Sequence, residues 1–335
     1  LDGLRGIAAL LVIWYHIFEG FATSPIDQRF NHGYLAVDFF FILSGFVVGY
    51  AYDDRWKTTM NTKDFFKRRL IRLHPMVILG AVLGAITFCI QGCEKWDGTQ
   101  VSISMVMLAL LLNLFLIPAV PGSGSEVRGN GEMYPLNGPS WSLFFEYSFA
   151  VCNLSGYGHL GVGWSLLDYN LLGGFLRLLF AFSAGLLMSR IFKPVKIRGA
   201  FWICSIAIAV LLSIPHIGGM EDSWMNGIYD SVCTIILFPI LVYLGASGKT
   251  TDKGTSVICK FLGDISYPLY IVHYPFMYLY YAWLWSGEKL TFSDTWPVAL
   301  VVFFGNILLA YLCLKLYDEP VRKWLTKKFL AKKQA

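Results

Sequence analysis

Ten long apolar stretches constrain what this chain can fold into more than any other feature of its sequence. The hydrocarbon core of a bilayer is about 30 Å thick, which about 20 mostly apolar helical residues can cross. Backbone polar groups must be satisfied internally in lipid, so such stretches form helices. We therefore expect an all-α, polytopic integral membrane protein with about ten transmembrane helices, in a single membrane-embedded domain over residues 1–335. The predicted spans are 4–22, 34–52, 74–92, 101–119, 139–157, 173–191, 199–216, 228–246, 265–285 and 295–317.

Charged residues are scarce and unevenly placed. They make up 15% of the 335 residues, whereas soluble proteins carry about 25%. Alternating the ten spans from a cytoplasmic N-terminus puts 22 of the 27 Lys and Arg residues on the cytoplasmic side, Arg128 among them. Because cytoplasmic loops carry such an excess, we expect both termini to be cytoplasmic. The net charge of +5 then reflects topology, and no nucleic-acid partner is expected.

The first apolar run contains one titratable group, His16, and follows Arg5. On an α-helix the eleven steps from Arg5 to His16 come within about 20° of whole turns, so the two residues share a face about 16 Å apart along the axis. An ionisable group at that depth in a membrane is a functional hypothesis, because an unpaired one is costly there. A neutral imidazole is a natural general base for a hydroxyl. The structural alternative is a histidine that donates a hydrogen bond to a neighbouring helix.

A basic cluster follows the second span. Arg68, Arg69 and Arg72 lie at the predicted cytoplasmic interface, with Arg68 and Arg72 one helical turn apart. Such a cluster suits a polyanion, for example the phosphates of a coenzyme. Anchoring to lipid headgroups is the alternative.

Two acidic residues lie near ends of predicted spans. Asp38, near the outer end of the second span, could pair with Arg29, or with His16 as an orienting carboxylate. Glu146 lies four residues after Ser142, so both occupy one helix face beside Trp141. Glu146 suits either a structural pair with a basic residue or a role in orienting a histidine or the substrate.

Glycine patterns predict close contacts. Gly45 with Gly49, and Gly80 with Gly84, would let the second and third spans approach neighbouring helices. The Gly- and Pro-rich stretch 120–140 is expected to form a lid or a re-entrant segment at the inner face.

Several catalytic motifs are missing from the sequence. It contains no phosphate-binding loop of the GxxxxGK[ST] type, no GxSxG, no HExxH and no CxxC. A serine-hydrolase or metal mechanism therefore has no support, and we expect no metal. Ten helices with intramembrane Arg, His and Asp would also fit a secondary transporter of a small solute. Against that alternative, the sequence has no two-halved repeat.

Six segments, taken together and in order, resemble the acyltransferase-3 family of integral membrane O-acyltransferases. They are LDGLRGIAALLVIWYH (1–16), GYLAVDFFFILSGF (33–46), FFKRRLIRLHP (65–75), PSWSLFFEY (139–147), GDISYPLYIVHYP (263–275) and YDEPVRKWL (317–325). Each motif alone is weak, but six in sequence over almost the whole chain are specific.

The resemblance implies transfer of an acyl group, most often acetyl from acetyl-CoA, from the cytoplasm to a hydroxyl of an extracytoplasmic carbohydrate or glycoconjugate. It implies a multi-pass protein of the cell membrane, expected to be a bacterial inner membrane. By the same resemblance, His16 and Arg5 are essential for transfer, and Arg68, Arg69 and Arg72 bind the coenzyme. We add Trp141, Ser142 and Tyr267 to the coenzyme site, and Asp38 and Glu146 to the catalytic group.

Two matters stay open at this level. His16 could deprotonate the acceptor hydroxyl for direct attack on the thioester, or it could carry the acyl group covalently. The interval 150–172 has less apolar length than the resemblance implies, which leaves open whether a helix is missing there. The acceptor, the acyl chain and the oligomeric state cannot be read from the sequence.

Overall fold

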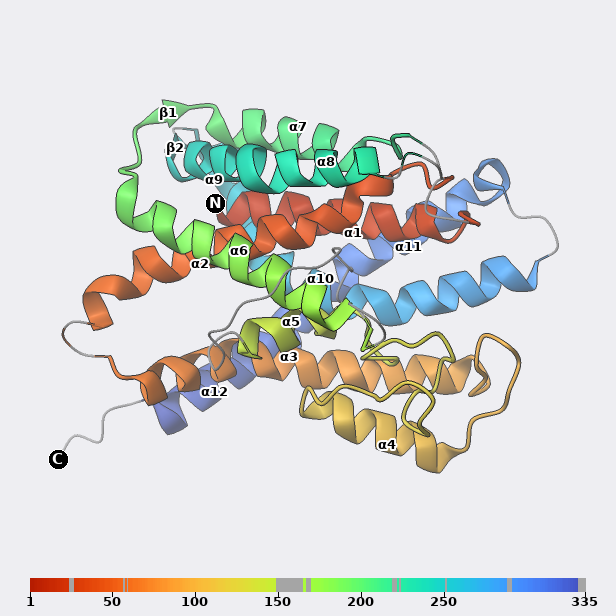
Figure 1. Cartoon of the computed structure of the whole chain (residues 1–335). Helices are drawn as coiled ribbons and strands as arrows, with labels where there is room; N and C mark the ends of the chain where they lie inside the picture. Colours follow the sequence, from red (N-terminus) through yellow and green to blue (C-terminus); the bar gives the residue numbers. More distant parts are fainter. Residues whose placement is uncertain are drawn as a thin grey trace. The chain divides into compact units, whose positions relative to one another are not determined.

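Helices make up nearly all of the regular secondary structure within the residues that the computed structural model describes (Figure 1). These residues are 1–23, 27–56, 58, 60–148, 165–166, 170–218, 222, 224–250, 252–287 and 291–330. The two short strands, β1 (Ile197–Arg198) and β2 (Gly248–Lys249), pair in parallel.

The helical elements follow the predicted apolar stretches. Those before residue 150 are α1 (Asp2–Glu19), the 3₁₀ turn η1 (Asn31–Leu35), α2 (Ala36–Trp56), α3 (Thr62–Ile90), α4 (Ile103–Leu114) and α5 (Ser140–Ser148). Those that follow are α6 (Asn170–Ile191), α7 (Ala200–Ser213), α8 (Trp224–Val232), the π turn η2 (Cys233–Leu237), α9 (Phe238–Ala246), α10 (Lys253–Ser286), α11 (Phe292–Cys313), the π turn η3 (Leu314–Asp318) and α12 (Glu319–Phe329). Every predicted span overlaps one of these helices. The fifth does so only up to Ser148, because 149–164, and with them most of the interval 150–172, lie outside the described residues.

Membrane-crossing character is clear for part of this set. In the described part of the chain, five helical segments are long and apolar enough to cross a bilayer: 31–56, 62–90, 171–191, 224–246 and 292–329. α4 and α7 are apolar but shorter. α1 is not among the five, and its 18 residues include the charges of Asp2, Arg5 and Glu19. An all-helical, multi-pass membrane protein is therefore confirmed, while the count of ten spans and the cytoplasmic termini stay predictions.

The chain divides into two compact units, which we describe separately. The first unit consists of residues 1–53, 177–270 and 283–304, and the second of 54–176, 271–282 and 305–335.

Glycine allows helices of the first unit to come close together. A Cβ added at Gly45 of α2 would lie 2.0 Å from the Phe182 carbonyl oxygen, and one at Gly185 of α6 would lie 1.9 Å from that of Ile42. The α2 and α6 backbones therefore touch directly, as the pattern at Gly45 predicted. α1 packs on α10 in the same way, because a Cβ at Gly6 would lie 2.4 Å from the Leu262 carbonyl oxygen.

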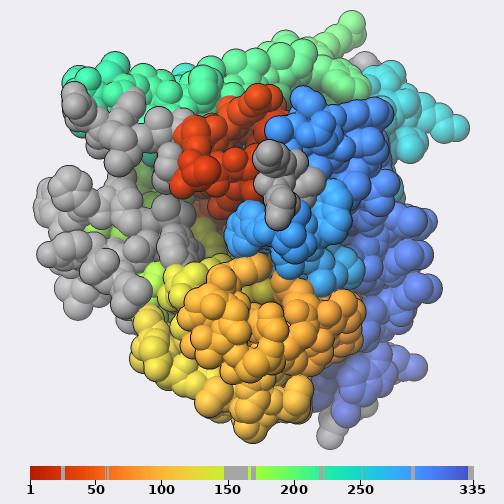
Figure 2. Space-filling model, turned by 90° about the vertical axis from the view of Figure 1, so that its right-hand side faces the viewer, coloured from red at the N-terminus to blue at the C-terminus, as the bar shows by residue number. Residues whose placement is uncertain are grey.

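Aromatic side chains fill the other side of α1 in the first unit. The Phe18 and Phe292 rings stack with centroids 4.7 Å apart, and the Trp14 ring meets that of Phe303 at 5.6 Å. Figure 2 shows the end of α1 (red) beside α11 (blue). These contacts, together with Gly6, fix the depth and rotation of the helix that carries His16.

In the second unit, the segment 120–140, predicted as a lid or a re-entrant segment, lies at the other end of α3 from the one expected. The Trp96 backbone N–H donates to the Arg128 carbonyl oxygen at 3.1 Å, and Arg128 Nη1 donates to Gln91 Oε1 at 2.8 Å. Arg128 therefore lies where α3 ends, remote from Arg68 at its start. Figure 2 shows the two neighbouring segments in orange and yellow. The prediction that Arg128 shares a side with Arg68 was wrong.

The reason lies in the length of α4. Its 12 residues extend only about 18 Å, so the chain turns back before it has covered the length of α3 and returns to the 91–98 loop. It then runs along α3, where a Cβ at Gly84 would lie 1.9 Å from the Leu136 carbonyl oxygen. Gly84 thus lies against an irregular segment, whereas a Cβ at Gly80 would meet both Asn137 Nδ2 at 2.4 Å and the Ile271 side chain of helix α10 at 2.7 Å. Residues 131–137 are buried throughout, which is the condition under which non-helical backbone is tolerated at membrane depth.

Candidate active site

His16 lies in the last turn of α1, and its ring is held by a carboxylate of the same helix. Nδ1 of His16 lies 2.7 Å from Glu19 Oε2, and the His16 side chain is 16% exposed. The spacing of three residues places both side chains on one face. Since a carboxylate accepts hydrogen bonds, this contact orients the ring with Nδ1 protonated and Nε2 as its basic nitrogen. Glu19 was not among the predicted site residues, although its i, i+3 spacing from His16 could have identified it.

Arg5 lies at the other end of α1, on the face predicted from the spacing. Its Nη1 makes an ion pair with Asp2 Oδ1 at 3.2 Å, and Asp2 is exposed. An exposed pair of this kind contributes little to stability. The Arg5 residue lies about 16 Å along the helix axis from His16.

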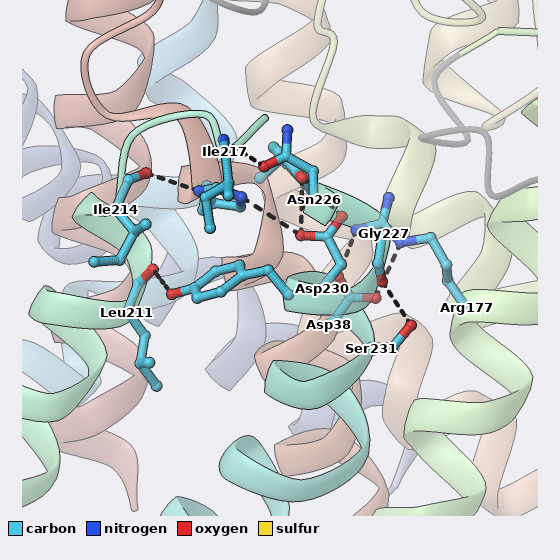
Figure 3. Close-up of polar contacts among 12 residues, drawn as sticks. Asp38, Arg177, Leu211, Ile214, Ile217, Asn226, Gly227, Asp230 and Ser231 are labelled. Carbon is cyan, nitrogen blue, oxygen red and sulfur yellow. Dashed lines mark hydrogen bonds and ion pairs between the residues drawn. The ribbon is translucent and has the colours of Figure 1, made fainter. Parts of the chain in front are cut away.

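Asp38 is bound by Arg177, and not by Arg29 or His16 as the sequence suggested (Figure 3). Arg177 Nε donates to Oδ1 at 3.0 Å and Nη2 to Oδ2 at 2.5 Å, which is bidentate geometry. The Arg177 side chain is 9% exposed and the Asp38 side chain 2%. This pair joins α2 to α6, and it uses the carboxylate that would have oriented the imidazole.

Near this pair lies a second polar group that sequence reasoning missed. The Tyr34 hydroxyl, on η1, donates to Asp230 of α8 at 2.8 Å, and His32 Nδ1 donates to the Ile214 carbonyl oxygen at 2.7 Å. The signal was present, since Asp230 is an acid inside the predicted apolar span 228–246.

The predicted coenzyme residues of the second unit lie on α3 and α5. α3 begins at Thr62, twelve residues before the predicted start of its span, so the whole basic run is helical. Arg69 makes an ion pair with Glu146, which is the structural alternative foreseen for this carboxylate, whereas Arg68 and Arg72 are exposed. Glu146 thus forms the structural pair with a basic residue that the sequence offered as one of its two roles.

The remaining predicted coenzyme residues lie on α5 and α10. Trp141 and Ser142 are buried in α5, and the Ser142 hydroxyl donates to the Pro139 carbonyl oxygen at 3.0 Å. Tyr267 is half-buried on the part of α10 that belongs to the first unit. No group of three or more His, Cys, Asp or Glu side chains that could hold a metal occurs among the described residues.

Comparison with known proteins gives a family match over most of the chain. The model of the family Acyl_transf_3, described as an acyltransferase domain, matches residues 1–315. "Protein 2 in picA locus" of Rhizobium radiobacter is 34% identical over 156 residues, which are 44% of this chain and 75% of that protein. "Acyltransferase MdmB" of Streptomyces mycarofaciens is 30% identical over 161 residues, 44% of this chain and 36% of the relative.

A longer alignment is found with a staphylococcal protein. "Putative O-acetyltransferase SACOL0978" of Staphylococcus aureus is 23% identical over 367 residues, which cover 96% of this chain and 57% of the relative. The chain thus spans little more than half the length of that relative. No solved structure matches the chain.

Proposed function

Because the chain belongs to the acyltransferase-3 family, we propose that it transfers an acetyl group from cytoplasmic acetyl-CoA to a hydroxyl of an extracytoplasmic carbohydrate or glycoconjugate. Acyl transfer is the activity of the family, and the name of the staphylococcal relative supports acetyl as the group and oxygen as its acceptor. The helical segments able to cross a bilayer support a donor and an acceptor on opposite sides.

The contact between His16 Nδ1 and Glu19 Oε2, at 2.7 Å, is the observation that carries the proposal. A carboxylate on one ring nitrogen fixes the tautomer and stabilises the imidazolium that forms when the other nitrogen takes a proton. His16 is thereby suited to act as a general base, with Glu19 in the orienting role that was first given to Asp38 or Glu146.

In the proposed reaction, His16 Nε2 takes the proton of the acceptor hydroxyl while its oxygen attacks the thioester carbon. The tetrahedral intermediate collapses with cleavage of the carbon–sulfur bond, and the departing thiolate receives the proton from His16. The products are the acetyl ester and free CoA, and His16 returns to its neutral form. The reaction requires no net proton and no metal.

Arg68 and Arg72 are assigned to the phosphates of the coenzyme. Both are exposed and lie one turn apart at the start of α3, so they present two guanidinium groups on one side of the helix. Arg69 is held by Glu146 and therefore fixes α5 against α3 instead of binding the ligand directly. Arg5, which pairs with the exposed Asp2 at the start of α1, is assigned to the donor side of that helix.

The role of His16 as general base can be tested by measuring acetyl transfer from [¹⁴C]acetyl-CoA by the protein purified into lipid nanodiscs. Removing a general base lowers turnover by about 10²–10⁴-fold, so we expect His16→Asn to lose activity on that scale while still binding acetyl-CoA. His74→Asn is the control, because it removes a half-buried imidazole from α3. Near-normal transfer by His16→Asn would refute the proposed mechanism.

The coenzyme assignment is tested separately. We expect Arg68→Ala and Arg72→Ala to raise the KM for acetyl-CoA about tenfold each, because each removes a charge-assisted hydrogen bond to phosphate. Lys63→Ala, which removes an exposed cation from the first turn of the same helix, should leave this KM unchanged. Equal effects of all three variants would indicate that the cluster serves lipid anchoring.

A further inference from the structure

Asp230, which Figure 3 labels, lies beside His32 and Tyr34 in the first unit. The Tyr34 ring also meets Tyr15, which precedes His16. Tyr34 and His32 belong to η1 and Asp230 to α8. The Tyr34 hydroxyl lies 2.8 Å from Oδ2 and 3.0 Å from Oδ1 of Asp230, and it can donate one hydrogen bond to that carboxylate.

The hydrogen bond to Ile214 determines which nitrogen of His32 carries the proton. A carbonyl oxygen only accepts, so His32 Nδ1, 2.7 Å from the Ile214 oxygen, must be the donor. In the neutral ring Nε2 is then an acceptor. It lies 3.8 Å from Asp230 Oδ1, which is also an acceptor.

Nε2 of His32 makes no hydrogen bond of ordinary geometry within the described part of the chain, although the Asn226 amide lies near the ring. The side chain of His32 is 0% exposed. Nε2 of His32, a fully buried acceptor, thus faces the Asp230 carboxylate, which also only accepts. Leaving a buried acceptor without a donor costs free energy, so a donor that reaches both groups would stabilise them.

The cluster has more acceptors than donors, and more negative than positive charge. Arg177 is bound in bidentate fashion by Asp38, so Asp230 is a second carboxylate beside one guanidinium group. A carboxylate can accept about four hydrogen bonds, and Tyr34 supplies one. The side chain of Asp230 is 22% exposed, so a donor from outside can reach it.

We propose that Asp230, with His32 and Tyr34 behind it, binds hydroxyl groups of the carbohydrate acceptor. This inference rests on the proposed function and names the substrate chemistry that the site selects. Sugar hydroxyls supply the donors that the cluster lacks. Since its two carboxylates outnumber its one guanidinium group, the site selects uncharged sugars and rejects sugar acids and phosphorylated sugars.

The subsite is fixed next to the turn that carries the base. A Cβ added at Gly33 would lie 2.3 Å from Cβ of Tyr15, so η1 packs directly on the last turns of α1. The rings of Tyr15 and Tyr34 also meet, with centroids 6.4 Å apart. Tyr15 precedes His16 in the sequence, so a hydroxyl bound at Asp230 is held close to the helical turn of the proposed base.

The experiment uses the full chain in nanodiscs with acetyl-CoA and five probes. Four are neutral methyl glycosides (of glucose, galactose, mannose and N-acetylglucosamine), and the fifth is methyl glucuronide. We expect at least one neutral glycoside to raise the unfolding temperature of the unmodified protein, and methyl glucuronide not to do so. Asp230→Asn should raise the concentration of that glycoside needed for half-saturation about tenfold, since a hydrogen bond to a charged group is lost. The concentration of acetyl-CoA needed for half-saturation should not change.

Two tyrosines provide a matched comparison. Tyr34→Phe removes the hydroxyl that donates to Asp230, whereas Tyr229→Phe removes one that donates to the Leu211 carbonyl oxygen on the other side of His32. We expect Tyr34→Phe to weaken glycoside binding and Tyr229→Phe to leave it unchanged. If Asp230→Asn fails to fold, the comparison of the two tyrosine variants still tests the proposed binding site.

The inference is overturned if no neutral glycoside stabilises the unmodified protein, if methyl glucuronide binds as well as the neutral probes, or if the Tyr34 and Tyr229 variants behave alike. Failure of the proposed function has a different signature. In that case the unmodified protein would release no CoA from acetyl-CoA, while the binding of glycosides and its loss in Asp230→Asn would persist.

Discussion

Arg177 in the first unit and Arg128 in the second are both buried guanidinium groups, but they are stabilised in opposite ways. Arg177 forms a bidentate pair with Asp38. Arg128 is fully buried and donates to neutral acceptors, the Pro135 carbonyl oxygen at 3.0 Å and Gln91 Oε1 at 2.8 Å. Its guanidinium carbon lies 3.6 Å from the centroid of the Tyr278 ring, with Phe88 and Trp96 at 4.8 and 5.0 Å.

The difference shows that a buried guanidinium group can be stabilised by aromatic rings and neutral acceptors as well as by a carboxylate. The aromatic cage offsets part of the cost of burying Arg128 through cation–π attraction, which is strongest where water is excluded. The contacts of Arg128 with Gln91 and Phe88 hold the segment 120–140 against the end of α3. The Arg177–Asp38 pair joins α2 and α6, and it also lies beside the partly exposed Asp230. The Arg177–Asp38 pair therefore borders a carboxylate that a ligand from outside can reach.

The largest effect is expected when the ion pair is broken. Arg177→Met leaves the 2% exposed carboxylate of Asp38 without its cation, which costs about 3–5 kcal/mol of unfolding free energy. Denaturation in mixed micelles measures this loss. The double variant Asp38→Leu/Arg177→Met should recover most of it, because an apolar pair avoids the desolvation of both charges.

The exposed pair between the same two helices is the control for this prediction. Arg190 Nε lies 2.6 Å from Asp53 Oδ2, and it too joins α6 to α2. Arg190→Met should cost no more than about 1 kcal/mol. Equal costs for the Arg177 and Arg190 variants would contradict a role for burial in the first pair.

An intermediate effect is expected for the caged arginine. Arg128→Met leaves a carbonyl and an amide oxygen without their donor but no bidentate carboxylate, and it should cost about 1–3 kcal/mol. Arg128→Lys should recover little, because an ammonium group lacks the planar shape that stacks on Tyr278. A loss as large as that of Arg177→Met would contradict this ranking, because the caged arginine would then stabilise the protein as much as the buried ion pair does.

The same contrast explains how far the sequence could predict this molecule. Apolar stretches predicted where helices form, and Gly45 predicted a close contact, because both depend on local composition. The place of Arg128 could not be predicted, since it depends on α4 ending after 12 residues, and the topology assumed that each apolar stretch crosses the membrane. The predicted third span began only at residue 74, whereas helix α3 already begins at Thr62 and includes the basic run.

The candidate site was predictable only in part. His16 and Arg5 share a helix, so their spacing alone related them. Asp38 was predicted to pair with Arg29 or His16, but its partner Arg177 lies 139 residues away, and nothing in a single sequence selects it from other cations. Asp230 and His32 come together only because α8 packs near η1, so their joint role follows from tertiary structure.

The smallest expected effect compares the N-caps of the two longest helices. Asp252 Oδ1 accepts from the Thr255 backbone N–H at 2.6 Å at the start of α10, and Asn61 Oδ1 accepts from that of Asp64 at 2.9 Å at the start of α3. The Thr255 N–H and hydroxyl lower the pKa of the Asp252 carboxyl. Because the folded-state pKa is depressed, the stabilisation is complete above the ordinary value of about 4 and is lost as the pH falls through the lowered pKa.

Exchanging the two cap types tests this dependence. Asp252→Asn keeps a cap of similar quality but removes the charge that interacts with the helix N-terminus, so the unfolding temperature at pH 7 should fall slightly. The difference from the unmodified protein should shrink as the pH is lowered toward 3. Asn61→Asp should raise the unfolding temperature slightly at pH 7, and this gain should disappear as the pH is lowered toward 3. A shift for Asp252→Asn that does not vary with pH would mean that hydrogen bonding alone, and not the charge, distinguishes the two caps.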